Sequence, residues 1–224
     1  SENNNDRNII LANGIKPSKE TQSLVKRSQA LSKADNSKMK KEIRIFTGHN
    51  GSVNCCAYAD GFFLSGGEDS NILSWDYDTG QLLRVFKGHQ AAVTSIAVFP
   101  NHKNFVSSDK KGIVYYWRYE SGESIEIFNS KIYHPYRWQT PVVDLSISPY
   151  GNVFIVGQEP LTIFMWVAAQ NQIYHLSGKL GGLLSGGENT RNYIGLYGGS
   201  AVATSSDGKF VAAASDRTIF LWDL

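Results

Sequence analysis

Histidine, cysteine and serine are the residues of this chain whose types could do covalent or metal chemistry. They do not occur in the spacings that such chemistry requires. The sequence contains no Gly-x-Ser-x-Gly, no His-Glu-x-x-His, no Cys-x-x-Cys and no glycine loop that ends in Gly-Lys-Ser or Gly-Lys-Thr. Metal-ligand spacing is also missing among the histidines, which are His49, His89, His102, His134 and His175. We therefore expect no enzyme, no bound metal and no cofactor.

The other chemistry that the residues offer is recognition of a protein or peptide. One segment, between Phe128 and Val142, gathers the types that dominate binding hot spots, because Tyr, Arg and Trp bury a large area at a modest entropy cost. Its candidate partner-binding residues are Tyr133, His134, Tyr136, Arg137 and Trp138. Packing is the alternative, in which the aromatic side chains fold down and fill a gap in the core. The sequence leaves both roles open.

The elements that must position these residues are strands. From Glu42 onward, short runs rich in Val, Ile, Phe, Tyr and Trp are broken by Gly, Asn, Asp and Ser every eight to twelve residues. This pattern predicts an all-β domain over residues 42–224. Residues 1–41 contain no aromatic residue and carry nine basic and four acidic side chains, a net charge of +5. We expect them to form a basic, flexible tail.

The whole chain is nearly balanced in charge, with 22 basic and 20 acidic residues and a net charge of +2. A dedicated nucleic-acid binder would carry a larger basic excess. The longest apolar run, Leu161 to Ala169, has nine residues, whereas a membrane-spanning helix needs roughly 18 or more. The first residues are polar and lack a secretory pattern. We expect a cytoplasmic or nuclear protein with no transmembrane segment.

Internal repetition is the strongest signal in the sequence. Phe-Thr-Gly-His at residues 46–49 recurs as Phe-Lys-Gly-His at residues 86–89, and each copy has a valine seven residues after the phenylalanine. Four strand-like segments then end in tryptophan, at Trp75, Trp117, Trp166 and Trp222. These motifs resemble the WD40-repeat family, whose fold is a β-propeller with one four-stranded sheet, or blade, in each repeat.

The resemblance implies a hydrogen-bonded brace inside each blade, made by a histidine, an aspartate and the tryptophan. Carried over by position, the brace residues are His49, Asp69 and Trp75 in the first copy, His89 and Trp117 in the second, and Asp216 and Trp222 in the last. Lys111 stands six residues before Trp117, where the second copy should carry its aspartate. We therefore expect the second brace to be broken, and all of these residues to be structural rather than catalytic.

The number of blades stays open at this point. Trp117 to Trp166 spans 49 residues and Trp166 to Trp222 spans 56. The last gap is too long for one repeat and too short for two. Inside the longer gap, residues 184–189 repeat residues 64–69 almost letter for letter. Four blades are recognisable, and the gap holds either a degenerate fifth blade or a glycine-rich loop. A truncated chain, omitted stretches and a ring completed by a second chain are all compatible with this count.

The resemblance also implies where a partner would bind. It places the aromatic segment on the same rim as the turns that carry Asp69, Lys110, Lys111 and Glu159. The function that we expect is a non-catalytic scaffold that binds a protein or peptide through these rim loops within a larger complex. The alternative is an adaptor that binds the phosphates of RNA or acidic lipid through the basic residues from Lys16 to Lys41.

Overall fold

The computed structural model describes residues 44–133, 139–158, 162–176, 183–185, 199–215 and 218–224. Within these residues almost all regular structure is strand, and the one short helix is α2 (Ser130–Tyr133). This confirms the all-β fold class. The proposed tail, residues 1–41, lies outside the described residues.

Each of the first two sheets consists of four sequential antiparallel strands. The strands of the first sheet are β1 (Val53–Ala59), β2 (Phe62–Gly67), β3 (Asn71–Asp76) and β4 (Leu82–Lys87). Those of the second are β5 (Val93–Val98), β6 (Asn104–Asp109), β7 (Ile113–Arg118) and β8 (Ser124–Asn129). Both follow from the sequence pattern, because β-branched and aromatic residues alternate between short turns.

The third and fourth sheets keep the same sequential order but differ in their number of described strands. The third contains β9 (Val142–Ile147), β10 (Asn152–Gly157), β11 (Thr162–Val167), β12 (Gln172–Leu176) and β13 (Leu183–Ser185). The fourth contains β14 (Gly199–Thr204), β15 (Phe210–Ser215) and β16 (Thr218–Asp223). Strand β13 pairs with β12, so the described part of the fifth-blade candidate is an edge strand of the third sheet.

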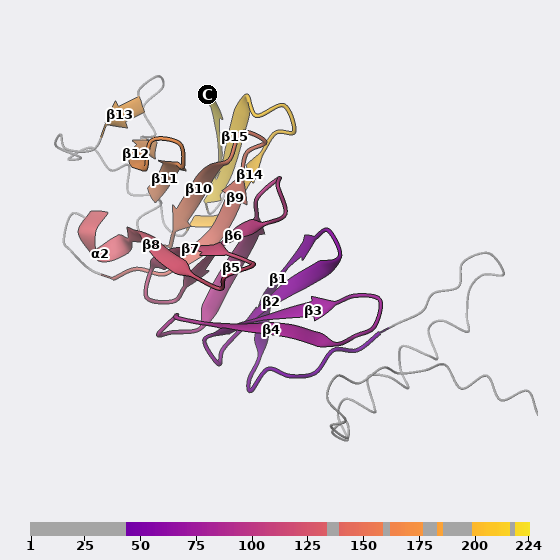
Figure 1. Cartoon of the computed structure of the whole chain (residues 1–224). Coiled ribbons are helices and arrows are strands. Elements are labelled where there is room, and N and C mark those ends of the chain that lie inside the picture. Colours follow the sequence, from indigo (N-terminus) through magenta and orange to yellow (C-terminus); the bar gives the residue numbers. More distant parts are fainter. Residues whose placement is uncertain (1–43, 134–138, 159–161, 177–182, 186–198, 216–217) are drawn as a thin grey trace, which may run out of the picture.

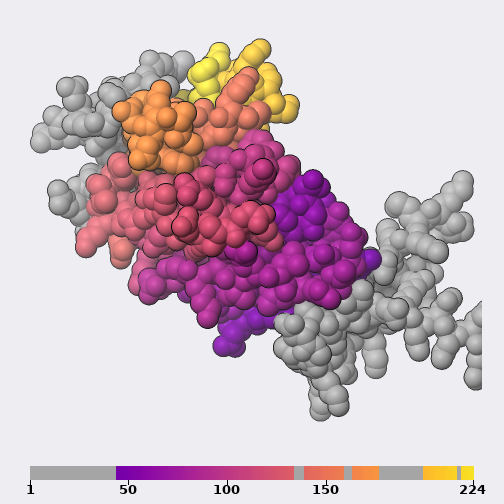
Figure 2. All heavy atoms as spheres, viewed as in Figure 1, coloured from indigo at the N-terminus to yellow at the C-terminus, as the bar shows by residue number. Residues whose placement is uncertain are grey.

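The four sheets follow one another in an open arc, and the first strand of each sheet lies beside the first strand of the next (Figure 1). Hydrogen bonds join these inner strands. Asn54 Nδ2 on β1 donates to the Val93 carbonyl at 3.0 Å, and Thr94 Oγ1 on β5 donates to the Val142 carbonyl at 2.6 Å. In the space-filling view the described residues form one continuous body, indigo at the first sheet and yellow at the fourth (Figure 2).

Asp144 on β9 joins three of the sheets. Its carboxylate accepts a hydrogen bond from Ser95 Oγ on β5 at 3.1 Å and another from the Val202 backbone N–H on β14 at 2.9 Å. One side chain therefore fixes the second and fourth sheets relative to the third.

The core consists of three seams, each formed where the faces of neighbouring sheets pack together, and a smaller fourth cluster around Trp75 in the first sheet. Trp117 lies in the seam between the first and second sheets, and Trp166 in the seam between the second and third. Trp222 is half-buried against the seam between the third and fourth sheets. Each of these tryptophans thus faces the preceding sheet. Trp75 is packed under Phe46 instead.

The far face of the fourth sheet is apolar and uncovered in the described structure. Ile219 is 77% exposed and Leu221 is 66% exposed. They pair across the strands with Ala214 and Ala212, so the four side chains share one face. No helix in the described residues is long and apolar enough to cross a membrane.

Candidate protein-binding rim

The first brace is a chain of hydrogen bonds across the first sheet. Trp75 Nε1 donates to Ser65 Oγ at 2.8 Å, Ser65 Oγ lies 2.8 Å from His49 Nε2, and His49 Nδ1 lies 3.0 Å from Asp69 Oδ1. An indole N–H can only donate, so Ser65 accepts from Trp75 and has its own proton to give to His49 Nε2. The neutral imidazole then donates from Nδ1 to Asp69, and every group is satisfied.

The expectation that Lys111 breaks the second brace is wrong. His89 Nδ1 lies 2.9 Å from Asp109 Oδ2, His89 Nε2 lies 2.6 Å from Ser107 Oγ, and Trp117 Nε1 donates to Ser107 Oγ at 2.8 Å. The carboxylate comes from the last residue of β6 rather than from the turn after it. Its Oδ1 accepts from the Lys111 backbone N–H at 2.9 Å, so Lys111 contributes its backbone and not its side chain.

The third sheet satisfies its tryptophan differently. Val156 stands ten residues before Trp166, at the position that serine holds in the first two sheets. The Trp166 indole donates instead to Asn171 Oδ1 at 3.2 Å. In the fourth sheet, Trp222 is described but Asp216 lies outside the described residues.

The Asp69 carboxylate is also tied to the backbone. Burial by itself raises the pKa of Asp69, but hydrogen bonds from the Asn50 backbone N–H, from His49 and from the Asn71 backbone N–H outweigh burial and lower the pKa. Asn50 N–H donates to Oδ2 at 2.8 Å and Asn71 N–H donates to Oδ1 at 3.2 Å. Asp69 therefore holds the loop before β1 against the turn after β2.

In three sheets, a backbone hydrogen bond connects the loop before the first strand to the turn after the second strand. These loops and turns together form one rim of the molecule. We call a joining loop the segment that precedes the first strand of a sheet, and the joining rim the edge made by these loops and the turns between second and third strands. The three hydrogen bonds run from the Glu68 N–H to the Ser52 carbonyl at 2.9 Å, from the Lys110 N–H to the Ala92 carbonyl at 3.0 Å, and from the Gln158 N–H to the Pro141 carbonyl at 2.9 Å. Joining loops and turns thus lie side by side.

Two neighbouring turns of the joining rim are linked by charge. Lys110 Nζ lies 2.7 Å from Glu68 Oε1, and the two side chains are 55% and 43% exposed. An exposed pair of this kind contributes about 0–1 kcal/mol to stability. Its effect is to present paired charges at the rim surface, next to the exposed Lys111.

Ser130, at the start of α2, fastens both ends of the third joining loop to the turn of the second sheet. Its backbone N–H donates to the Gly112 carbonyl at 2.9 Å, and its buried hydroxyl accepts from the Thr140 backbone N–H at 3.0 Å. Gly112 has φ of +76°, and a Cβ there would collide with Ser130 Oγ and the Thr140 carbonyl. Glycine is required at this contact.

Tyr133 is the member of the aromatic segment that the structure describes, and it takes part in packing. Its ring stacks on Phe128 with centroids 5.1 Å apart and tilts against Phe164 at 5.5 Å. Burial raises the pKa of its hydroxyl, yet 37% of the residue stays exposed beside Ile132, which is 69% exposed. The remaining candidates of this rim, His134, Tyr136, Arg137, Trp138 and Glu159, lie outside the described residues.

Sequence reasoning missed Ser65, Ser107, Asp109 and Ser130. A signal existed for three of them: serine stands ten residues before both Trp75 and Trp117, and each brace histidine is followed by aspartate at a spacing of 20. Ser130 has no such signal, because its role depends on a turn 18 residues upstream. Within the described ranges, no group of three or more His, Cys, Asp or Glu side chains could hold a metal ion.

Comparison with known proteins agrees with this geometry. The family described as "WD domain, G-beta repeat" matches residues 40–76, 80–118 and 198–223. Cell division control protein 4 of Saccharomyces cerevisiae is 26% identical over 203 residues, which are 83% of this chain and 24% of that protein. The guanine nucleotide-binding protein subunit beta of Arabidopsis thaliana is 26% identical over 193 residues, 80% of this chain and 46% of that protein.

A third relative is transcription initiation factor TFIID subunit 5 of Caenorhabditis elegans, 26% identical over 154 residues, which are 66% of this chain and 21% of that protein. The chain spans less than half the length of each of these three relatives. The matches show that the chain contains WD40 repeats, which confirms the family expected from the Gly-His and tryptophan motifs. The matched residues fall in the first, second and fourth sheets, and the four antiparallel sheets in sequence are consistent with an incomplete WD40 propeller.

Proposed function

We propose that this chain is a non-catalytic scaffold that binds a protein or peptide through the joining rim, as part of a larger cytoplasmic or nuclear complex. The observation that carries the proposal is the Ser130 contact. This contact supports the proposal because it ties the start of the joining loop that contains the aromatic segment to the turn that carries the basic residues Lys110 and Lys111.

Rigid anchoring matters because binding energy is lost when loops must be ordered on association. The ends of the third joining loop are held together at Ser130 and Thr140, whose backbone N–H bonds to Ser130 Oγ. Ser130 in turn bonds to Gly112, in the turn that follows the Asp109 of the second brace. Hot-spot residues between those two anchors, Tyr136, Arg137 and Trp138, would need less ordering on binding than the same residues in a loop with free ends.

The relatives support the assembly part of the proposal. Two of those named above are described as subunits, one of a guanine nucleotide-binding protein and one of a transcription initiation factor. The transfer of that role to this chain is part of the proposal, and the partner and the pathway are not transferred.

The test is capture of partners from an extract of the source cells, with the partner identified by mass spectrometry and its affinity then measured with purified components. The double change Trp138→Ala with Tyr136→Ala should weaken binding by at least about tenfold, the equivalent of about 1.4 kcal/mol. The matched control is Tyr58→Ala, which removes an exposed aromatic ring from the first sheet, far from the joining loop. Full affinity in the double variant would exclude this rim as the binding surface.

Salt distinguishes the alternative function. If residues 1–41 bind RNA or acidic lipid through the lysines from Lys16 to Lys41, the logarithm of affinity should fall linearly and steeply with the logarithm of salt concentration. A hot-spot interface on the rim should change little over the same range. Steep salt dependence that disappears on deletion of residues 1–41 would favour the alternative.

A further inference from the structure

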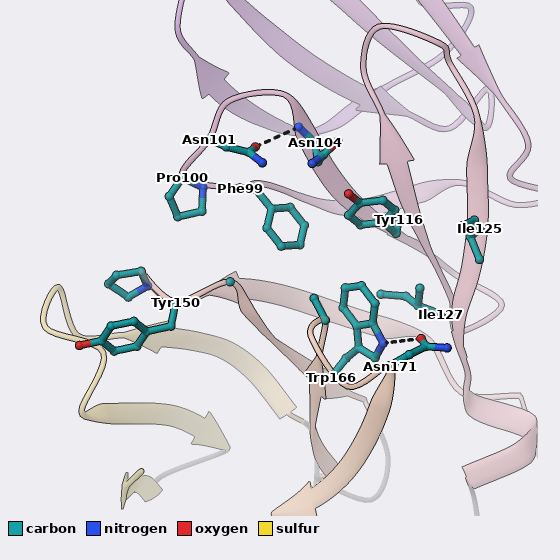
Figure 3. A pocket seen from close by; sticks show the side chains of 13 residues that line it. Phe99, Pro100, Asn101, Asn104, Tyr116, Ile125, Ile127, Tyr150, Trp166 and Asn171 are labelled. Carbon is teal, nitrogen blue, oxygen red and sulfur yellow. Dashed lines mark hydrogen bonds between the residues drawn. The ribbon is translucent and has the colours of Figure 1, made fainter.

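A second concave site lies on the opposite rim, the edge formed by the turns between first and second strands and between third and fourth strands (Figure 3). It is a pocket of about 590 Å³ at the end of the seam between the second and third sheets. Pockets that bind ligands have volumes of roughly 300–1,000 Å³. None of the rim residues proposed above lines it.

The walls of the pocket are aromatic and aliphatic. Phe99 and Trp166 form its deep part, where they belong to the seam core, and Tyr116 lies above Trp166 (Figure 3). Ile125, on the edge strand β8, is 56% exposed, and Tyr150 is 76% exposed. Apolar side chains exposed together around a concavity typically mark a binding site.

The lining contains no charged side chain. Its polar groups include two asparagines on opposite sides of the pocket, Asn101 and Asn171 (Figure 3). A ligand with a formal charge would lose its hydration here and meet no opposite charge, which disfavours it strongly. The site therefore suits an uncharged ligand.

Hydrogen bonds from N–H donors fix the orientation of the two asparagine side-chain amides, because only the Oδ1 atom of an amide can accept them. Asn101 Oδ1 accepts from the Lys103 backbone N–H at 2.9 Å and from the Asn104 backbone N–H at 3.3 Å. Asn171 Oδ1 accepts from Trp166 Nε1 at 3.2 Å. Each amide therefore has its oxygen occupied and keeps Nδ2 as the group that can donate to a ligand, so the matching ligand groups are acceptors such as peptide carbonyls.

The wall at Tyr150 is held in place by the fourth sheet. Tyr150 Oη donates to the Asp207 carbonyl at 3.2 Å, and its ring lies against Gly208, where a Cβ would come within 2.5 Å of Tyr150. The fourth sheet therefore supports one wall of a pocket whose lining comes from the second and third sheets.

From these observations we propose that the pocket binds an uncharged stretch of a partner polypeptide in extended conformation. A bulky apolar side chain of the partner enters between Phe99, Tyr116 and Trp166, and the flanking peptide carbonyls accept hydrogen bonds from Asn101 Nδ2 and Asn171 Nδ2. This site is separate from the joining rim, so the chain can hold two partners, or two parts of one partner, at once.

The experiment is a selection of random short peptides, displayed on phage, against the full chain, followed by affinity measurement of the selected synthetic peptides by fluorescence anisotropy. Peptides that depend on the pocket should share a Phe, Leu, Ile or Met without charged neighbours. Ile125→Asp places a charge at the exposed lip and should weaken these peptides at least about tenfold. Leu83→Asp is the matched control, because Leu83 holds the same position in β4 that Ile125 holds in β8, is 47% exposed and does not line the pocket.

A second variant tests the donor role of the amides without removing their structural contacts. Asn101→Asp with Asn171→Asp keeps the acceptor oxygens for the backbone and for Trp166 and replaces both Nδ2 donors by oxygens. This variant should lose the uncharged peptides and select basic ones instead. The proposal is overturned if no selected peptide loses affinity in Ile125→Asp relative to Leu83→Asp, or if the wild-type chain selects charged peptides at this site. Trp138→Ala with Tyr136→Ala should leave pocket binding unchanged, so failure here is distinct from failure at the joining rim.

Discussion

At the scale of single residues, one serine in each of the first two sheets holds two other side chains. Ser107 is fully buried and accepts from Trp117 while it pairs with His89. Removing its hydroxyl leaves the indole N–H of Trp117 and the Nε2 atom of His89 without partners at a buried position, while His89 Nδ1 keeps Asp109. Unsatisfied buried polar groups cost about 1–3 kcal/mol each.

We therefore expect Ser107→Ala to lower the free energy of unfolding by about 2–4 kcal/mol, measured by urea denaturation. Lys111→Ala should change it by less than about 0.5 kcal/mol, because exposed side chains contribute little and only the Lys111 backbone bonds to Asp109. A large loss in Lys111→Ala together with no loss in Ser107→Ala would contradict the second brace.

Asp69 adds a pH dependence. Its pKa in the folded chain lies below the ordinary value of 3.8, so the folded state favours the ionised carboxylate. This contribution to stability is complete above the unfolded pKa and is lost as pH falls through the lowered folded pKa. The difference in unfolding free energy between the wild type and Asp69→Asn should be largest near neutral pH and shrink below about pH 4. A difference that stays constant into strong acid would contradict this role, and Glu68→Gln, on the same turn, is the control for a change of charge at the rim.

At the scale of elements, the turn between β6 and β7 and the third joining loop form one unit. Gly112 lets the backbone of Ser130 and Thr140 approach the turn, and its φ is positive. An alanine there would meet both unfavourable backbone conformation and steric overlap. Gly61 has φ of +83° but open space around it. An alanine at residue 61 therefore tests the backbone conformation without steric overlap.

Gly61→Ala should cost about 1 kcal/mol of unfolding free energy through conformation alone. Gly112→Ala should cost about 2–4 kcal/mol, since the overlap is added. Hydrogen exchange should also become faster at the Ser130 and Thr140 amides in Gly112→Ala and not in Gly61→Ala. Equal costs for the two variants would show that the turn and the loop do not depend on their close approach.

At the scale of the whole molecule, stability comes from the packing of each sheet face against the next sheet. The far face of the fourth sheet has no described sheet against it, although the corresponding face of the first sheet is buried. Leu64 and Ile72 of the first sheet are fully covered by the second. Ile219 and Leu221 lie on the corresponding face of the fourth sheet and are open. Exposed apolar patches of this kind promote association.

Ile219→Asp with Leu221→Asp should therefore change the free energy of unfolding by no more than about 1 kcal/mol while it reduces self-association in analytical ultracentrifugation. Val211→Asp, on the buried face of the same sheet, should instead cost more than about 3 kcal/mol, because it buries an unpaired charge. A strong loss of stability in the double variant would show that its face is already covered in solution.

Sequence alone was sufficient for the class of fold and for His49, Asp69 and Trp75 of the first brace, but not for the Ser65 that links two of them. Strands and turns are local patterns, and tryptophans 42 residues apart repeat a unit that can only bury its faces by stacking on its neighbours. The position of the second carboxylate required the structure. The position six residues before Trp117 is Lys111, so the sequence offered no aspartate there. His89 Nδ1 needs only a carboxylate within hydrogen-bond distance, and Asp109 provides it from the end of β6.

The two proposed binding sites also differ in whether the sequence alone could reveal them. The aromatic segment of the joining rim is contiguous, so its composition could be recognised in the sequence. The pocket on the opposite rim is lined by residues from Phe99 to Asn171 that belong to two sheets and carry no motif. The oxygens of its two amides are occupied, that of Asn101 by backbone N–H groups of its own turn and that of Asn171 by the Trp166 indole, which leaves Nδ2 as the donor. Such a site exists only after the sheets have packed, since the packing brings together residues that the chain keeps far apart.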